Sequence, residues 1–139
     1  MKTKIVIDTN VFIGALIGKQ YSANRKLIEL CLKQEFCPLM NNTLYAEYED
    51  VIHRPKIGSR SLFEEHEINE LFDAFLSSCK WIKIYYLWRP NLRDEKDNYL
   101  VELAVAGNAN VIVTHNIKDF QQNQLKFPQI KIKKPQEII

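Results

Sequence analysis

The chain alternates between short apolar runs, typical of buried strands, and longer stretches whose apolar residues recur at helical spacing. The strand-like runs are Lys4–Asp8, Phe36–Met40, Trp81–Tyr85, Asn110–Thr114 and Gln129–Lys133, the last with polar residues at alternate positions, as in an edge strand. The helical stretches run from Asn10 to about Ile17, from about Ala23 to Gln34, from an N-cap among Asn41–Thr43 to about His53, from a capping box at Ser61–Glu64 through Cys79, and from Glu95 to about Ala106. This alternation predicts one α/β domain over residues 1–139, with a mostly parallel sheet of about five strands and helices on both faces in a three-layer α/β/α arrangement.

The apolar positions also indicate how the helices pack. The helix after Asn41 turns one side to the core, made of Leu44, Tyr48, Val51 and Ile52. The helix after Ser61 has the clearest amphipathic pattern, with Ile68, Leu71, Phe72, Phe75, Leu76 and Cys79 at helical spacing. The Glu95–Ala106 helix is apolar over most of its circumference, so we expect it to be buried. Arg54–Gly58 is expected to break the chain, Tyr86–Arg93 to form a loop, and Gly107–Asn110 to stop the last helix.

Composition narrows the class of protein. The chain has 139 residues, enough for one hydrophobic core, and 19 basic against 17 acidic residues give a formal charge of +2. No apolar run approaches the roughly 18 residues of a membrane span, and Asp8 interrupts the N-terminal run too early for a signal peptide. We therefore expect a cytoplasmic protein without a membrane segment. The three cysteines, Cys31, Cys37 and Cys79, are odd in number and lack a C-x-x-C pair, so we expect reduced thiols.

Acidic and amide side chains gather where the predicted strands end. Asp8 closes the first strand, Asn41 the second and Thr114 the fourth, and Asn116 and Asp119 follow Thr114. Glu47 stands about one turn into the helix after the second strand, and Asp94 and Asp97 mark the start of the helix after the third. Ligands of such sheets collect beyond the carboxyl ends of the strands. Each acid alone has an ordinary explanation as a helix cap or first-turn acid. It is the occurrence of all of them at the strand ends that indicates a functional site.

Several carboxylates in one cleft repel one another, by about 4 kcal/mol for a pair at about 4 Å and an effective dielectric near 20. The repulsion is relieved when pKa values rise or when a cation binds. Oxygen ligands suit a hard cation such as Mg²⁺ or Mn²⁺ better than zinc. A metal-bound water can act as the nucleophile in phosphodiester hydrolysis.

Four segments together resemble the PIN domain ribonucleases, in particular the VapC-like toxins of prokaryotic toxin–antitoxin systems. They are IVIDTNVFIGALI at 5–17, LYAEYEDVIHRPKIG at 44–58, RDEKDNYLVELAVAGNANVIVT at 93–114 and THNIKDF at 114–120, and the closing IKIKKPQEII is similar to the last strand of the family. The resemblance covers essentially the whole chain in order. It implies a PIN-like fold and a metal-dependent endoribonuclease that cleaves single-stranded RNA. It also implies a toxin silenced by a cognate antitoxin protein, and a homodimer.

The resemblance also assigns the site residues. It implies that a catalytic metal site is formed by Asp8, Glu47, Asp97 and Asp119. Asn116 stands where many members have another acid, and Asp94 corresponds to an accessory acid of a run that is sparse here, with Leu92 and Arg93 in place of acids and proline. Thr9, Asn10 and Thr114 correspond to residues that orient the acids. These residues would hold Mg²⁺ or Mn²⁺ and the attacking water.

Other marked residues have two interpretations each. Arg54, Lys56 and Arg60 are expected in one loop, where they contact an RNA backbone or form a solvated turn. Tyr85, Tyr86 and Trp88 either stack on unpaired bases or pack in the core or at a dimer interface. His115 is a candidate donor to a phosphate.

Two other functions compete with the nuclease. The first is a non-catalytic PIN module that binds RNA or protein, which the presence of all four acids disfavours. The second is an Asp-based phosphotransferase on a doubly wound sheet. A dehalogenase-type phosphatase needs D-x-D, whereas position 10 is Asn, and a response-regulator receiver needs an acidic pair near the first strand that is absent here.

Overall fold

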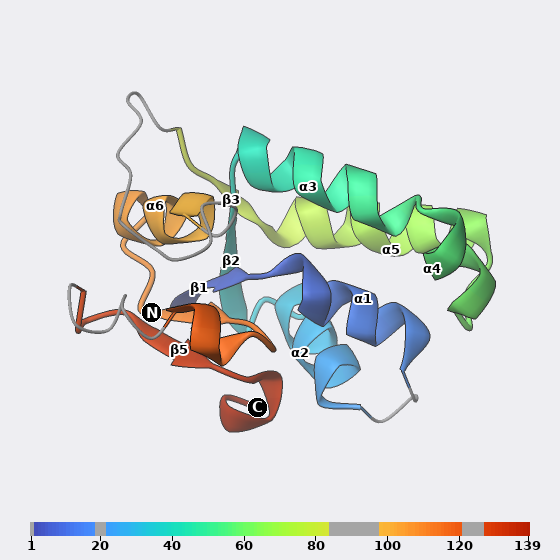
Figure 1. Ribbon diagram of the computed structural model, residues 1–139. Coiled ribbons are helices and arrows are strands. Elements are labelled where there is room, and N and C mark those ends of the chain that lie inside the picture. The colour runs from blue at the N-terminus through green and yellow to red at the C-terminus, as the bar shows by residue number, and fades with distance from the viewer. Residues whose placement is uncertain (1, 19–21, 84–97, 121–126) are drawn as a thin grey trace.

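The computed structural model describes residues 2–18, 22–83, 98–120 and 127–139. In these ranges a five-stranded, all-parallel sheet carries helices on both faces (Figure 1). The strands are β1 (Thr3–Ile7), β2 (Phe36–Met40), β3 (Lys80–Trp81), β4 (Val111–Val113) and β5 (Lys131–Lys133). The helices are α1 (Thr9–Ile17), α2 (Ala23–Leu32), α3 (Asn42–Ile52), α4 (Pro55–Arg60), α5 (Glu65–Ser78) and α6 (Asn98–Ala106), with 3₁₀ turns at Ile117–Phe120 and Pro135–Glu137. The predicted α/β/α class is confirmed.

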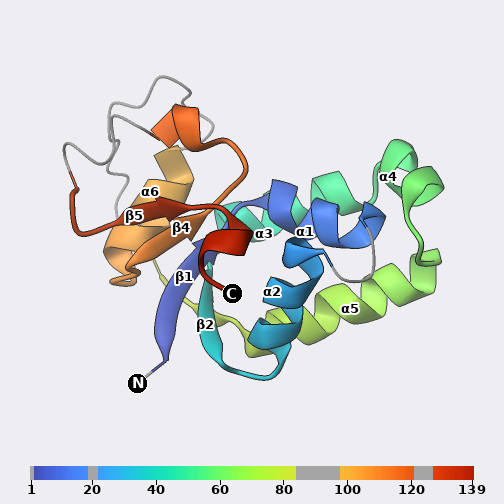
Figure 2. The same ribbon diagram turned by 90° about the horizontal axis from the view of Figure 1, so that it is seen from below.

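The strand order β3-β2-β1-β4-β5 explains the layers. The connections from β1 to β2 and from β2 to β3 step in one direction across the sheet, whereas the connection from β3 to β4 steps back. Because parallel crossovers are right-handed, the helices of the first two connections lie on one face and α6 lies on the other. Figure 2 shows α6 on one side of β1 and β2, and α1, α2 and α5 on the other. Because all neighbouring strands are parallel, their carboxyl ends lie at the same edge of the sheet, where ligands of such sheets bind.

The core forms where the apolar pattern predicts it. Ile5, Val6 and Ile7 of β1 are at most 1% exposed, because a central strand is covered on both faces. The predicted inner side of α3 is fully confirmed, since Leu44, Tyr48, Val51 and Ile52 are all buried. Cys31 is buried as a free thiol, and burial raises its pKa to about 12, so it stays protonated. No helix in the described ranges is long and apolar enough to cross a membrane.

Several predicted boundaries match the structure. β2 has the predicted bounds, Asn41 caps α3 by accepting the Leu44 N–H at 2.8 Å, and β5 lies at an edge of the sheet. The α6 helix ends as expected, but the left-handed residue is Asn108 rather than Gly107. Gly107 is needed for packing, because a Cβ there would lie 2.4 Å from Leu39 Cδ1.

Two predictions about the segment between α3 and α5 are wrong. Arg54–Gly58 is not a simple break, because residues Pro55–Arg60 form the short helix α4, with Pro55 at its first turn where proline is favoured. The capping box of α5 lies at Glu64 and Glu67, not at Ser61 and Glu64. Ser61 instead donates to Leu16 O at 3.2 Å and accepts the Phe63 N–H at 3.0 Å.

The third strand is shorter than predicted. It covers Lys80–Trp81 instead of Trp81–Tyr85. Its partner β2 ends at Met40, opposite Trp81, and a last hydrogen bond joins Ile82 N to Met40 O at 2.8 Å. The remainder of that prediction from residue 84 on, the loop Tyr86–Arg93 and the first three residues of the Glu95 helix lie outside the described residues.

Candidate metal centre at the carboxyl edge of the sheet

Asp8 is the first residue after β1 and occupies the centre of this edge. β1 pairs with β2 on one side and with β4 on the other, and the ladder continues because Asp8 N donates to Val113 O at 2.9 Å. Asp8 is also the N-cap of α1, although its side chain makes no capping hydrogen bond. The carboxylate therefore projects from the junction of the central strand and its helix, and only 6% of the residue is exposed.

Two side chains hold the Asp8 carboxylate in place. Thr114 Oγ1 donates to Asp8 Oδ2 at 2.8 Å, and Asn10 Nδ2 donates to the same oxygen at 3.2 Å. Asn10 Nδ2 also lies 3.3 Å from Thr114 Oγ1. Since Thr114 follows β4 and Asn10 stands in the first turn of α1, the carboxylate is fixed by two elements that are far apart in the sequence. These contacts fit the orienting role expected for Asn10 and Thr114. Thr9 is buried beside them at the start of α1.

The segment after β4 is tied to the same cluster. Asn116 N donates to Thr114 Oγ1 at 3.0 Å, and His115 N donates to Asn10 Oδ1 at 3.3 Å. Asp119, half-buried in the 3₁₀ turn that follows, donates its backbone N–H to Asn116 O at 3.1 Å. The segment that carries Asp119 therefore starts at the Asp8 cluster.

Sequence patterns did not single out Asn24 of α2. Its Oδ1 accepts from His115 Nε2 at 2.6 Å, which places the ring hydrogen on Nε2 in the neutral imidazole. Burial and the charge of Lys134 lower the pKa of His115, while Asp8 acts in the opposite direction. Gly14 leaves the room for Asn24, because a Cβ at Gly14 would lie 2.3 Å from Asn24 Nδ2. In the sequence, Gly14, one helical turn after Asn10, was the residue that could have indicated this close approach of Asn24.

Burial is the largest influence on the charge of Asp8. It raises the pKa of the carboxyl group above its ordinary value, and the nearby charge of Glu47 raises it further. The hydrogen bond from Thr114 and the neighbouring N–H groups of Thr9 and Asn10 act in the opposite direction. Burial outweighs these hydrogen bonds, so an ionised Asp8 destabilises the metal-free fold. A bound cation would relieve this penalty, and the donors present, carboxylate oxygens beside hydroxyl and amide groups, suit Mg²⁺ or Mn²⁺.

Glu47 reaches this edge from α3, where it is half-buried. The next residue, Tyr48, is fully buried and donates its hydroxyl hydrogen to Ile7 O at 2.8 Å. Ile7 directly precedes Asp8, so this bond joins the helix that carries Glu47 to the strand that carries Asp8. The structure therefore brings Asp8, Glu47, Asn10 and Thr114 into one electrostatic and hydrogen-bonded group. Asp94 and Asp97 lie outside the described residues.

We expect Tyr48→Phe to lower the free energy of unfolding by about 1–3 kcal/mol, because it leaves the buried Ile7 carbonyl without this donor. Urea denaturation followed by circular dichroism measures the change. Tyr45→Phe is the matched control, since the Tyr45 hydroxyl bonds the partly exposed Glu49 on the same helix. Equal losses in the two variants would contradict a special role for the Tyr48 bond.

The predicted acids do not form a compact trio in the described part of the chain. There, the trio of ligand atoms within 4.8 Å of one another is Glu64, His66 and Glu67. All three are exposed at the start of α5, where Glu67 accepts the Glu64 N–H at 3.0 Å as part of the helix cap. The cap accounts for this cluster, and it does not include Asp8, Glu47 or Asp119.

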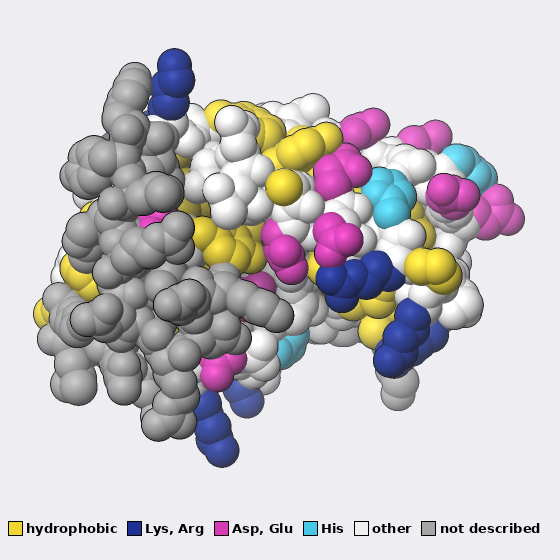
Figure 3. Space-filling model, turned by 45° about the horizontal axis from the view of Figure 1, so that its top comes forward, with side chains coloured by type: hydrophobic (Ala, Val, Ile, Leu, Met, Phe, Trp, Pro, Cys, Tyr) yellow, Lys and Arg dark blue, Asp and Glu magenta, His cyan; other side chains and the backbone are white. Residues whose placement is uncertain are grey.

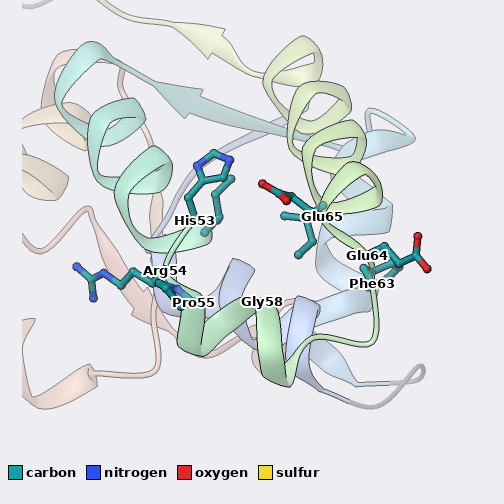
Figure 4. Close-up of a pocket in the computed structure, with 9 residues that line it drawn as sticks. His53, Arg54, Pro55, Gly58, Phe63, Glu64 and Glu65 are labelled. Atoms are coloured by element: carbon teal, nitrogen blue, oxygen red, sulfur yellow. The ribbon is translucent and has the colours of Figure 1, made fainter.

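Two of the three predicted phosphate contacts lie on the short helix α4 rather than in a loop, and the third immediately precedes that helix. Lys56 and Arg60 are exposed on α4, and Arg54 precedes it and donates to Asp50 at 2.6 Å. Figure 3 shows Lys and Arg side chains beside Asp and Glu side chains on this end of the molecule. Arg54 also borders a cavity of about 470 Å³ between α3, α4 and α5, where Figure 4 shows it pointing away from Glu64 and Glu65. The other candidates for RNA contact, Tyr85, Tyr86 and Trp88, lie outside the described residues.

The raised pKa of Asp8 predicts how stability depends on pH in the absence of metal. The folded state binds the Asp8 proton more tightly than the unfolded state, so stability is lost as pH rises from about 3.9, the ordinary aspartate value, through the folded-state pKa. Asp8→Asn removes this loss, and an asparagine oxygen still accepts from Thr114 and Asn10. We therefore expect the variant in EDTA to melt above the native protein near neutral pH, by a margin that shrinks on acidification.

Thermal melting at several pH values with EDTA and with Mn²⁺ tests this. Mn²⁺ should raise the melting temperature of the native protein more than that of Asp8→Asn, because it binds the folded site. A difference in melting temperature that does not change with pH would contradict a raised pKa of Asp8 in the folded state.

Two comparisons place the chain among known proteins. The family model described as PIN domain matches residues 4–118. An uncharacterized protein, MJ1680, of Methanocaldococcus jannaschii is 28% identical over 144 residues, which cover 97% of this chain and 87% of that protein. The matched residues include Asp8, Glu47, Asp97 and Thr114 and most of the described sheet. The chain belongs to the PIN domain family, which is part of a superfamily of metal-dependent nucleases.

Proposed function

We propose that this protein is a divalent-metal-dependent endoribonuclease that cleaves single-stranded RNA. One observation carries the proposal: a carboxylate that is 6% exposed is held by Thr114 and Asn10 at the ligand-binding edge of a PIN fold, with a second carboxylate, Glu47, close enough to raise its pKa. A buried carboxyl group with a perturbed pKa beside a second carboxylate is typical of a functional site. Membership of a nuclease family supports a phosphodiester as the bond that is broken.

The roles of the residues follow from their positions. Asp8 and Glu47 would hold Mg²⁺ or Mn²⁺, together with Asp97 and Asp119, which the sequence resemblance assigns to the same site. When bound, the cation offsets the charge that develops on the phosphate and lowers the pKa of the attacking water. Thr114 and Asn10 fix the Asp8 carboxylate in one orientation. Asn116 is held against Thr114 by its backbone N–H and sets the path of the chain toward Asp119.

Incubation of the purified protein with end-labelled RNA tests the proposal. We expect cleavage of single-stranded RNA in Mn²⁺ or Mg²⁺, none in EDTA, and slower or no cleavage of the same sequence as a duplex. Binding of RNA without cleavage under any of these conditions would favour the non-catalytic PIN module and overturn the enzyme. Cleavage that persists in EDTA would exclude the metal mechanism.

The biological role is a finer proposal that rests on the resemblance to VapC-like toxins. A toxin should arrest the growth of cells in which it is expressed, and an antitoxin protein should relieve the arrest. The proposed homodimer is tested by sedimentation of the purified chain. Normal growth during high expression of an active enzyme would argue against a toxin while leaving the nuclease assignment intact.

A further inference from the structure

Trp81 is a large apolar side chain that remains 48% exposed at the edge of the sheet where the candidate site lies. It ends β3, and its ring is supported by Tyr45 of α3, with 5.8 Å between the ring centroids. Sequence patterns assigned Trp81 to a strand and gave it no further role. An exposed tryptophan held by a second ring has the form of a stacking platform.

A cavity of about 580 Å³ opens beside this indole ring. Its lining includes Asn42 and Thr43 from the first turn of α3, Lys83 after β3, and Glu102 of α6. The wall is therefore mixed: one aromatic face, small polar side chains that donate and accept hydrogen bonds, a buried carboxylate and an exposed lysine. This chemistry fits a flat polar ligand better than an apolar peptide.

The cavity is a short distance from Asp8. Ile5 of β1 lies beside Pro38 of β2, so the same register continued for two residues brings Ile7 beside Met40, and Met40 pairs with Trp81. Neighbouring strands are about 4.8 Å apart, so the backbone of Trp81 lies roughly 10 Å from the strand end that carries Asp8. An extended single strand whose phosphate lies at Asp8 can therefore bring a nearby base to Trp81.

We propose that this cavity binds one unpaired nucleobase of the RNA substrate, stacked on Trp81. The subsite deepens the proposed function and rests on it. The carboxylate of Glu102 repels a phosphate and accepts hydrogen bonds from base N–H groups, so the base rather than the backbone occupies the cavity. Lys83, which also lines the cavity, supplies a positive charge that favours the phosphate of the same nucleotide nearby.

The test measures binding in EDTA, where cleavage does not interfere. A short fluorescein-labelled single-stranded RNA is titrated with the native protein, Trp81→Ala and Trp81→Phe, and fluorescence polarisation gives each Kd. We expect Trp81→Ala to raise Kd about 5- to 100-fold, as loss of one stacked base does, and Trp81→Phe to restore most of the affinity. Leu62→Ala is the control, because Leu62 is 68% exposed and lies outside this cavity.

Further measurements separate the subsite from other roles of Trp81. In Mn²⁺, Trp81→Ala should raise KM for RNA cleavage with little change in kcat, because the residue binds substrate away from the reacting phosphate. RNA binding that depends on Trp81 without any cleavage supports the subsite and contradicts the nuclease. Equal Kd values for native protein, Trp81→Phe and a folded Trp81→Ala overturn the subsite alone. A change from dimer to monomer in Trp81→Ala with unchanged RNA affinity would assign Trp81 to a subunit interface and overturn it too.

Discussion

Asp8→Asn should lower the rate of metal-dependent RNA cleavage at least about 100-fold, the upper range for loss of residues that merely support a metal ligand. The variant keeps the shape of the side chain and an oxygen for Thr114 and Asn10, so the site retains its packing. It loses the negative charge that binds the cation. Single-turnover cleavage of labelled RNA with Mn²⁺ measures the change, and circular dichroism verifies the fold.

The control for this prediction is Asp73→Asn, which removes an exposed carboxylate of α5. It should leave the cleavage rate within about twofold, since Asp73 is not among the proposed metal ligands and the charge of an exposed carboxylate is screened by solvent and salt. Titration with Mn²⁺ adds a second readout, because a missing ligand raises the metal concentration needed for activity. Equal cleavage by native protein and Asp8→Asn would remove Asp8 from the mechanism and with it the proposed site.

The sequence was most informative where burial creates a periodic pattern. β1 was located correctly because its apolar residues form a continuous run, as in a strand buried on both faces, and α3 because its apolar residues recur with the helical period. Helix α4 has six residues, none of them buried, so it has no apolar period to detect. The capping box was misplaced because Ser61 and Glu64 fit the pattern by type, whereas the tertiary contact of Ser61 with Leu16 O gives Ser61 a different partner.

The candidate site shows a different limit. Residue types at strand ends indicated Asp8 and Thr114, but their hydrogen bond spans 106 positions and exists only because β1 and β4 are neighbours in the sheet. Strand order follows from the whole set of crossovers rather than from a local pattern. Asn24 and Trp81 were missed for a similar reason: one is a polar residue of an ordinary helix, and the other looked like a strand residue until its exposure was known.

The aromatic core next to the site gives the largest expected effect on stability. Phe12 of α1 is fully buried, and its ring centroid lies 5.5 Å from that of Tyr48, 5.9 Å from Phe72 and 5.3 Å from Phe75. Through these rings α1 packs against both α3 and α5. Because Asp8 is the N-cap of α1 and α3 carries Glu47, the same contacts help to fix the relative positions of the two acids.

Phe12→Ala should therefore lower the free energy of unfolding by about 3–5 kcal/mol, the usual result of deleting a buried ring and leaving a cavity. This is a large part of the roughly 5–15 kcal/mol that stabilises a typical domain. Phe12→Leu fills most of the space and should lose clearly less. Urea unfolding of both variants gives the values. A loss below about 1 kcal/mol for Phe12→Ala would mean that the three rings close around the gap, which the close packing of protein interiors opposes. With a loss in the expected range, the variant should also need more Mn²⁺ for cleavage, because a loosened α1 no longer holds Asp8 at a fixed distance from Glu47.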